Sequence, residues 1–575
     1  MERQDRKMSY REEAERWILR MDDEKLKAEL EGILDNEKAL EERFAVPMEF
    51  GTAGLRGVMG AGPAMMNVYT VRQATQGLAD FVRAKTGGSG LVAISYDSRN
   101  NSKLFAEESA AVLAANGVKS VIYKELMPTP MLSFAVRDSK ADAGIMVTAS
   151  HNPAKYNGYK VYGPDGCQMT IEDANAVLVQ IRSHDIFDSR TMDFEKAVES
   201  GMVSYIGDDL IERYFDAVEE CSINKDVIGE QDIKLVYSPL NGTGNKPVRH
   251  MLGRKGLKNI VVVKEQELPD GDFPTCTYPN PEMLPALALG LKLCAEEDAD
   301  LFIATDPDAD RTGLVIRDGE GYRVLTGNEI GILLLDYICK ARTEAGIMPE
   351  RPVAVRSIVS TSLVDRLAAD YGVEMRKVLT GFKFIGEQIL HLEQTGEEKR
   401  FIFGFEESMG YLSGSYVRDK DAVLASMLVC EAASYWKSKG KTLAEILDGI
   451  YEKYGWYRNR VISISFEGAD PDTMPSIMRG LRRSIPEGFA CRKVEEYTDY
   501  LTGEELNIAS GEKKQTGLPS SDVLEYGLEG GAKVIVRPSG TEPKMKIYLT
   551  AKESTEAESV ELLDELEADA REALK

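Results

Sequence analysis

The acidic loop Asp306–Arg311 carries the clearest chemistry in this 575-residue sequence. Its three aspartates are spaced by two residues: Asp306, Asp308 and Asp310. Alternate side chains of an extended segment point the same way, so the three carboxylates can meet one hard cation such as magnesium (Mg2+). An EF-hand is excluded, because its sixth and twelfth positions would be Arg311 and Arg317 instead of Gly and Glu. The loop therefore predicts a magnesium site.

A second loop, Thr148–Pro153, places Ser150 on a polar turn directly after the apolar run Gly144–Val147. A serine is a weak nucleophile unless it is activated, and no Ser-His-Asp order surrounds it, so an acyl-transfer triad is not supported. A phosphorylated serine beside a divalent cation needs no triad, since the cation neutralises phosphoryl charge and positioning does most of the rest. The two loops together indicate phosphoryl transfer.

Composition and charge exclude several other functions. The net charge of −25 disfavours nucleic-acid binding, which needs a basic surface. The seven cysteines include no CxxC pair, which indicates free thiols in a reducing cytosol. No apolar run approaches the roughly 18 residues of a membrane span, and the charged N-terminus lacks a signal-peptide core. We therefore expect a cytoplasmic protein that binds neither nucleic acid nor membrane.

Strand-like and helical segments alternate along the chain, which predicts an α/β layer fold. Leu91–Tyr96 and Leu301–Thr305 are expected to be buried strands, and residues 1–45 a helical N-terminal extension. Three loops with distinctive chemistry follow apolar, strand-like runs. In open α/β sheets, ligands bind beyond the carboxyl ends of the strands. Three such strand ends, from three domains, could therefore face one cleft. Four domains are expected, with these bounds: 1–205 (phosphoserine loop), 206–325 (metal loop), 326–455 and 456–575.

The last domain is expected to be smaller and of the α+β class. Its stretch 503–519 is rich in Ser, Gly and Glu and is interpreted as an exposed connection. The acidic end, Glu553–Lys575, is interpreted as an exposed amphipathic helix with a solvated face.

Four motifs in this order resemble the α-D-phosphohexomutase superfamily, in particular its long bacterial phosphoglucomutases near the phosphoglucomutase/phosphopentomutase branch. They resemble its phosphoserine loop (Thr148–Pro153), metal loop (Asp306–Arg311), sugar-binding loop (Gly404–Ser408) and phosphate-binding loop (Arg537–Thr541). The resemblance implies three α/β sandwich domains with mixed sheets plus a smaller α+β C-terminal domain around a central cleft. It also implies a small phosphosugar as partner and a monomer or homodimer.

The resemblance assigns a role to each matching residue. Ser150 would carry the phosphoryl group and, with Asp306, Asp308 and Asp310, contact Mg2+. Catalytic roles beside the phosphoserine would fall to His151, Lys160 and Arg56, with Lys160 and His151 as candidates for general acid and base. The implied substrate-binding residues are Arg311, Thr380, Glu406, Ser408, Lys420, Arg537, Ser539, Gly540 and Thr541.

The activity that the resemblance implies is reversible transfer of phosphate between O1 and O6 of α-D-glucose, through a glucose 1,6-bisphosphate intermediate. Phe405 before Glu406 matches the pentomutase-like branch, so a phosphopentomutase stays open, as does a mutase for mannose or glucosamine phosphates. A magnesium-dependent sugar phosphatase is a further alternative. A catalytically silent sugar-phosphate sensor is disfavoured, because a sensor needs no nucleophile.

Overall fold

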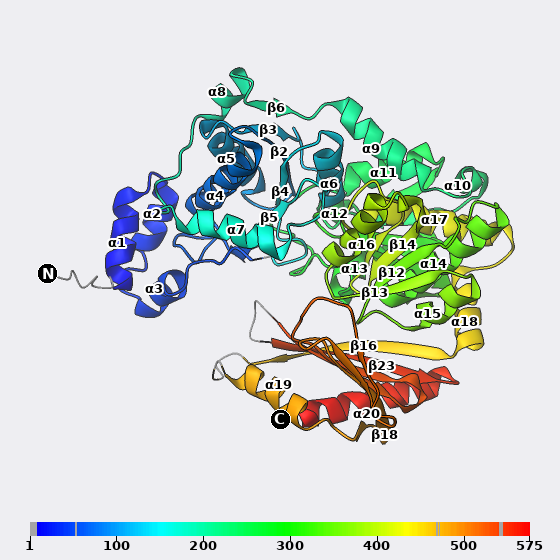
Figure 1. Cartoon of the computed structure of the whole chain (residues 1–575). Helices are drawn as coiled ribbons and strands as arrows, with labels where there is room; N and C mark the ends of the chain where they lie inside the picture. The colour runs from blue at the N-terminus through cyan, green and yellow to red at the C-terminus, as the bar shows by residue number, and fades with distance from the viewer. Residues whose placement is uncertain (1–8, 52–53, 467–469, 471, 540–543, 575) are drawn as a thin grey trace. The chain divides into compact units, whose positions relative to one another are not determined.

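Strands and helices alternate along most of the chain in the computed structural model (Figure 1). The structure describes residues 9–51, 54–466, 470, 472–539 and 544–574. The chain forms two units. The first contains residues 1–324, 386–401 and 409–438, and the second contains residues 325–385, 402–408 and 439–575. None of the described helices has the length and hydropathy needed to cross a bilayer.

The first sheet of the first unit has six strands in the order β1-β5-β4-β2-β3-β6. Their bounds are β1 (Leu55–Val58), β2 (Leu91–Tyr96), β3 (Lys119–Ile122), β4 (Ala143–Val147), β5 (Tyr156–Tyr162) and β6 (Val203–Tyr205). The sheet is mixed, because β2 runs parallel to β3 and β4 whereas β5 runs antiparallel to β1 and β4. Its helices are α4 (Val68–Thr86), α5 (Ser102–Ala115), α6 (Thr129–Asp138), α7 (Ile171–Arg182) and α8 (Phe194–Glu199).

The predicted N-terminal extension is helical, with α1 (Tyr10–Arg20), α2 (Glu24–Glu31) and α3 (Glu37–Phe44). Ser9 and Glu12 form a capping box that begins α1. Trp17 is fully buried, and its ring lies 5.9 Å from that of Tyr69 and 5.1 Å from that of Phe187. These edge-on aromatic contacts anchor the extension to the first sheet's helical layer.

The second sheet of the first unit has five strands in the order β11-β10-β9-β7-β8. Their bounds are β7 (Lys234–Ser238), β8 (Asn259–Val262), β9 (Leu301–Thr305), β10 (Thr312–Asp318) and β11 (Gly321–Val324). Its helices are α9 (Asp208–Glu220), α10 (Val227–Glu230), α11 (Asn245–Arg254), α12 (Lys264–Glu267) and α13 (Leu284–Glu297). Gly290 of α13 lets the helix approach β9, since a Cβ there would lie 2.0 Å from the Phe302 ring. Also in this unit are η1 (Glu398–Arg400), β15 (Gly410–Leu412) and α17 (Ala422–Ser438).

The second unit contains β12 (Val353–Ser357) and β13 (Glu374–Val378), which pair in parallel, and most of β14 (Phe401–Glu406). Its helices here are α14 (Gly327–Glu344), α15 (Leu363–Asp370) and α18 (Leu443–Tyr454), and α16 (Phe382–Gln394) begins in this unit.

The C-terminal sheet of the second unit follows the order β16-β23-β22-β21-β18-β19-β20, with β17 paired to β18, and its pairs are antiparallel. The strands are β16 (Trp456–Ser465), β17 (Gly488–Phe489), β18 (Arg492–Asp499), β19 (Glu504–Asn507), β20 (Lys513–Gln515), β21 (Leu524–Leu528), β22 (Lys533–Pro538) and β23 (Lys544–Glu553). Between and after them lie α19 (Thr473–Arg483), η2 (Glu529–Gly531) and α20 (Glu556–Ala573).

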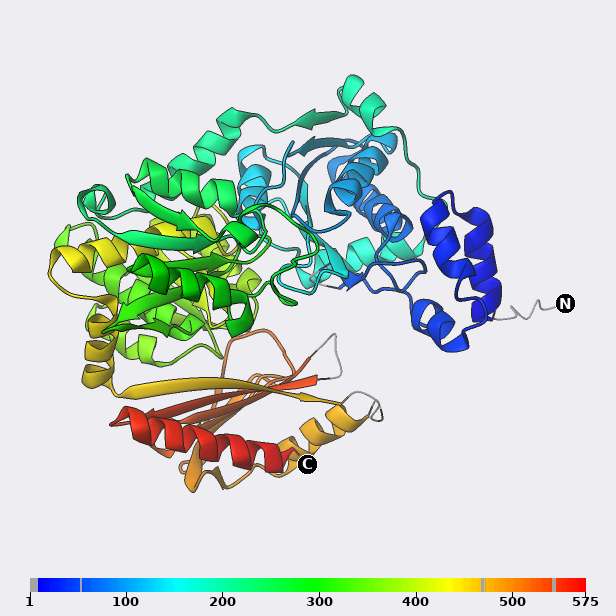
Figure 2. The ribbon, with the colours of Figure 1, turned by 180° about the vertical axis from the view of Figure 1, so that it is seen from behind.

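The α/β fold class with a smaller α+β C-terminal domain is confirmed, and β2 and β9 have the predicted bounds. Two local expectations were incomplete. The stretch 503–519 is mostly exposed but contains the strands β19 and β20. The C-terminal helix α20 lies along the last sheet (Figure 2), where Leu562 and Leu566 are buried in its core. The four domain bounds and the central cleft stay predictions.

Candidate active site

The phosphoserine loop begins where the buried strand β4 ends. Ser150 has a left-handed backbone (φ 53°), which costs a non-glycine residue roughly 1–2 kcal/mol. The Thr148 hydroxyl oxygen accepts a hydrogen bond from the Ser150 N–H at 2.8 Å, which holds the turn. Strain of this kind is kept where the surrounding structure fixes it, and it clusters at functional sites. The turn leaves the Ser150 side chain buried, with only 5% of the residue exposed.

Arg99, which sequence reasoning missed, holds this loop in place. Its guanidinium donates to four backbone carbonyls: those of Ser150, Asn152 and Pro153 in the loop, and that of Tyr156 at the start of β5. The buried Asp97 carboxylate lies 3.3 Å from Arg99 Nε and balances the charge. An Asp-x-Arg sequence directly after a buried strand is the signal that could have pointed to this role, because a buried arginine needs a partner.

The metal loop joins β9 to β10, and its three aspartates are buried. Each offers a carboxylate oxygen, and these oxygens lie within 4.8 Å of one another. Oδ1 of Asp308 and Oδ1 of Asp310 are buried without a hydrogen-bond partner among the described residues. Buried carboxylate oxygens without a partner are costly, and a divalent cation would satisfy them. The donor set therefore fits a hard metal ion.

The structure brings the phosphoserine loop and the metal loop into direct contact. Ser150 Oγ donates to Asp306 Oδ2 at 3.0 Å, although the two residues lie in different sheets' loops. Two lysines reach the same carboxylates. Lys160 Nζ on β5 lies 2.8 Å from Asp308 Oδ2, and Lys420 Nζ lies 3.0 Å from Asp310 Oδ2. Sequence reasoning did not anticipate that Lys420 would lie beside the metal loop.

Burial and mutual repulsion set the electrostatics of the three carboxyls. Burial, together with the charges of Asp310 and Asp308, raises the pKa of Asp306 well above its usual value. Burial and the Asp308 charge also raise the pKa of Asp310. For Asp308 burial acts in the same direction, but the Lys160 ammonium and its hydrogen bond outweigh it and lower the pKa. Burial and mutual repulsion therefore disfavour three negative charges side by side in this loop, and a bound cation would favour them.

His151 lies beside the serine oxygen, with its Nδ1 3.1 Å from Ser150 Oγ. Burial and then the neighbouring Arg311 and Arg56 charges lower the pKa of His151 well below 6.5. The imidazole is therefore neutral near pH 7. This geometry distinguishes His151 from Lys160, whose ammonium contacts Asp308 Oδ2.

Two arginines named as candidates lie around this centre. Arg56 is an exposed residue of β1. Arg311 donates its backbone N–H to Asp306 Oδ1 at 3.0 Å, and its guanidinium contacts the Glu282 carboxylate at 2.8 Å. Arg311 therefore stabilises the metal loop in addition to the substrate-binding role expected of it.

The sugar-loop candidates lie in the second unit. Glu406, at the end of β14, accepts a hydrogen bond from the Gly381 N–H at 2.7 Å, which places it next to Thr380. Thr380 Oγ1 is buried and has no hydrogen-bond partner among the described residues. Glu407 accepts from the Ser357 hydroxyl at 3.0 Å and so ties the loop to the end of β12. Ser408 follows directly and is partly exposed.

Of the phosphate-loop candidates, Arg537 is a partly exposed residue near the end of β22, and Ser539 follows that strand. Gly540 and Thr541 lie outside the described residues. Ile535 of β22 packs in one apolar cluster with Leu379, the neighbour of Thr380. Within the second unit, the strand that carries Arg537 therefore packs against the segment that carries Thr380.

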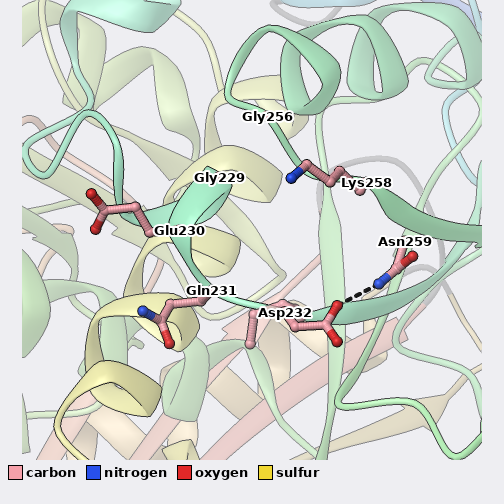
Figure 3. A pocket seen from close by; sticks show the side chains of 8 residues that line it. Gly229, Glu230, Gln231, Asp232, Gly256, Lys258 and Asn259 are labelled. Atoms are coloured by element: carbon pink, nitrogen blue, oxygen red, sulfur yellow. Dashed lines mark hydrogen bonds between the residues drawn. The ribbon is translucent and has the colours of Figure 1, made fainter.

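A separate hollow in the first unit is lined by residues 229–233, 256, 258 and 259 (Figure 3). It includes the Lys258 side chain and the carboxylates of Glu230 and Asp232, but none of the predicted site residues.

Fold and site together define a multidomain α/β protein with a buried serine, carboxylate and lysine centre suited to phosphoryl transfer. Family models described as phosphoglucomutase/phosphomannomutase match in chain order: α/β/α domain I (47–186), domain II (212–319), domain III (326–454) and the C-terminal domain (502–570). The chain belongs to the phosphoglucomutase/phosphomannomutase family.

Individual relatives agree with this assignment. A phosphoglucomutase of Staphylococcus saprophyticus is 37% identical over 529 residues, which cover 91% of this chain and 94% of the relative. One of Staphylococcus aureus is 36% identical over 540 residues, 94% of this chain and 95% of the relative. The crystal structure of a putative phosphomannomutase from Thermus thermophilus matches with a TM-score of 0.68 and 25% identity, covering 92% of this chain and 99% of that one. The resemblance inferred from the four motifs is confirmed.

Proposed function

We propose that the protein interconverts α-D-glucose 1-phosphate and glucose 6-phosphate through phosphorylated Ser150 and a glucose 1,6-bisphosphate intermediate. The contact of Ser150 Oγ with Asp306 Oδ2 at 3.0 Å is the observation that carries the proposal. It sets a potential phosphoryl carrier against a buried carboxylate group that fits a divalent cation. The relatives named phosphoglucomutase support glucose as the sugar.

The reaction consists of two transfers of the same kind. In the first, a general base takes the proton of the free O6 hydroxyl of glucose 1-phosphate while phosphorus bonds to O6. The bond between phosphorus and Ser150 Oγ breaks, and a general acid protonates the serine oxygen, giving the bisphosphate. The bisphosphate turns around, and its O1 phosphoryl group passes to Ser150 Oγ, which releases glucose 6-phosphate. The phosphoserine is regenerated, so no phosphate is consumed.

Charge and proton handling follow from the residues around Ser150. Mg2+ bound by Asp306, Asp308 and Asp310 with the phosphoserine would neutralise phosphoryl charge. His151, whose ring lies beside Ser150 Oγ, and Lys160 are the candidates for the general acid and base that move the hydroxyl protons. Lys160 and Lys420 hold the carboxylates in place.

The remaining candidates would bind the substrate away from the reacting phosphorus. Thr380, Glu406 and Ser408 would hydrogen-bond sugar hydroxyls, since carboxylates and hydroxyls suit that role. Arg537, Ser539, Gly540 and Thr541 would hold the non-transferring phosphate, and Arg56 and Arg311 would supply positive charge near the phosphoserine. A monomer or homodimer in the cytoplasm stays the expected state.

A coupled assay for conversion of glucose 1-phosphate to glucose 6-phosphate tests the proposal. We expect activity that requires Mg2+ and rises with a trace of glucose 1,6-bisphosphate, and intact-mass measurement should find one phosphoryl adduct that peptide mapping places on Ser150. Free phosphate released in step with substrate loss would identify a phosphatase instead. Faster conversion of ribose 1-phosphate would identify a phosphopentomutase.

A further inference from the structure

Thr129 lies at the start of α6, and both of its hydrogen-bond donors contact Asp308 of the metal loop. Its N–H donates to the backbone carbonyl of Asp308 at 2.9 Å, and its hydroxyl donates to Asp308 Oδ2, also at 2.9 Å. The residue is fully buried, so no bulk water competes for these bonds. The motif analysis gave Thr129 no role.

The two carboxylate oxygens of Asp308 differ in their hydrogen bonds. Oδ2 accepts from Thr129 Oγ1 and from Lys160 Nζ, the latter at 2.8 Å. Oδ1 is buried and has no hydrogen-bond partner in the described part of the chain. Because Oδ2 is already satisfied by two donors, Oδ1 is the oxygen left for a cation.

We propose that Thr129 is a positioning residue for the metal, which fixes the Asp308 carboxylate so that Oδ1 faces the cation. The inference rests on the metal role of Asp308 in the proposed function. Lys160 supplies charge through a long flexible side chain, whereas Thr129 has one side-chain torsion to its hydroxyl and sits on a helix that packs on β2 and β4. The orientation of the Asp308 carboxylate is therefore set by a helix that packs on β4, the strand that leads to Ser150.

Thr129→Val tests the proposal, since it keeps the side-chain shape and removes only the hydroxyl donor. Mg2+ binding to the full-length, chelator-stripped protein is measured by titration calorimetry without sugar. We expect roughly 10- to 100-fold weaker binding, the usual effect of losing a hydrogen bond to a metal ligand. Thr129→Ser, which keeps the hydroxyl, should bind Mg2+ nearly as tightly as the unaltered protein.

Thr75→Val is the matched control. Thr75 is equally buried, but its hydroxyl bonds to Val71, Ser109 and Tyr159, none of them a metal-loop residue. Its Mg2+ affinity should be unchanged. In Mg2+-saturated assays, KM for glucose 1-phosphate should also be unchanged in Thr129→Val, because the residue is proposed to act on the metal ligand alone.

Unchanged Mg2+ affinity in folded Thr129→Val, or equal weakening in Thr129→Ser, would overturn the proposal. If the valine variant does not fold, Thr129→Ala replaces it, since alanine removes the hydroxyl without placing a methyl group against the carboxylate. Binding is measured without substrate, so Thr129-dependent Mg2+ affinity in a protein without mutase activity would refute only the proposed function.

Discussion

Polar groups are paired differently in two regions of the molecule. One region is the centre around Ser150 in the first unit, and the other is the sugar and phosphate loops of the second unit. In the first, charges are buried and paired within the protein, as Lys160 with Asp308 and Lys420 with Asp310. In the second, the buried Thr380 hydroxyl has no partner in the described part of the chain, and Arg537 is partly exposed. Burying an unpaired charge costs much more free energy than burying an unpaired neutral hydroxyl. The charges therefore need partners within the protein, whereas the hydroxyl can remain without one until a ligand binds.

Substitutions in the two regions should therefore affect different properties of the protein. In the first unit, removing a charged group breaks a network on which both folding and chemistry depend. In the second unit, removing a hydroxyl that has no partner among the described residues should affect the substrate alone. Four pairs of substitutions measure this difference.

Ser150→Ala should abolish nearly all mutase turnover and leave the fold intact, because it removes the proposed phosphoryl carrier but no charged group. The coupled assay measures turnover, and thermal unfolding measures stability. Ser139→Ala is the control and should keep full activity, because the hydroxyl of Ser139 donates to the Ala135 carbonyl in α6. Substantial turnover in Ser150→Ala would refute the nucleophile assignment.

Asp308→Asn should greatly reduce Mg2+-dependent activity, because the change removes the charge of a proposed metal ligand and the charged partner of Lys160. A Mg2+ titration of the rate should show a weaker apparent affinity and a lower plateau. Asp298→Asn, at a side chain that is 87% exposed, should leave the titration unchanged. An unaltered titration curve for Asp308→Asn would count against the metal loop.

Arg99→Met should destabilise the protein by about 3–5 kcal/mol, since it leaves the buried Asp97 without its counter-charge. It also removes the hydrogen-bond donor to three loop carbonyls and to that of Tyr156, so turnover should fall with stability. Urea denaturation measures the free energy of unfolding. Arg213→Met, which breaks ion pairs of an exposed arginine, should leave the unfolding midpoint almost unchanged. Equal losses of unfolding free energy in the two variants would contradict the role of Arg99 in holding the loop.

Thr380→Val should raise KM for glucose 1-phosphate by roughly three- to tenfold, the effect of losing one neutral hydrogen bond. Its unfolding temperature should not fall, because the hydroxyl has no partner among the described residues. Thr343→Val, which loses a hydroxyl bonded within α14, should keep its KM. A clear loss of stability in Thr380→Val would remove the contrast between the two units.

The sequence was sufficient for the α/β class, for the strands Leu91–Tyr96 and Leu301–Thr305, and for the loops that follow such strands. These are local properties, since apolar runs, turn residues and carboxylate spacing can be read within a few positions. The two short strands within 503–519 were missed because their residues are mostly polar and are exposed or half-buried, so no hydrophobic alternation marks them. The buried face of α20 was underestimated because many acidic residues are interspersed with its apolar ones, which favoured a solvated helix.

By itself the sequence determined which groups are available for chemistry: a serine, three aspartates and the arginines and lysines of four motifs. Only the tertiary structure decided which atoms meet, including Ser150 Oγ with Asp306, Lys420 with Asp310, and Thr129 with Asp308. The physical reason is that residue types fix donors, acceptors and charges locally. Their contacts, in contrast, arise from packing between sheets that are distant in the chain, and no spacing rule encodes that packing.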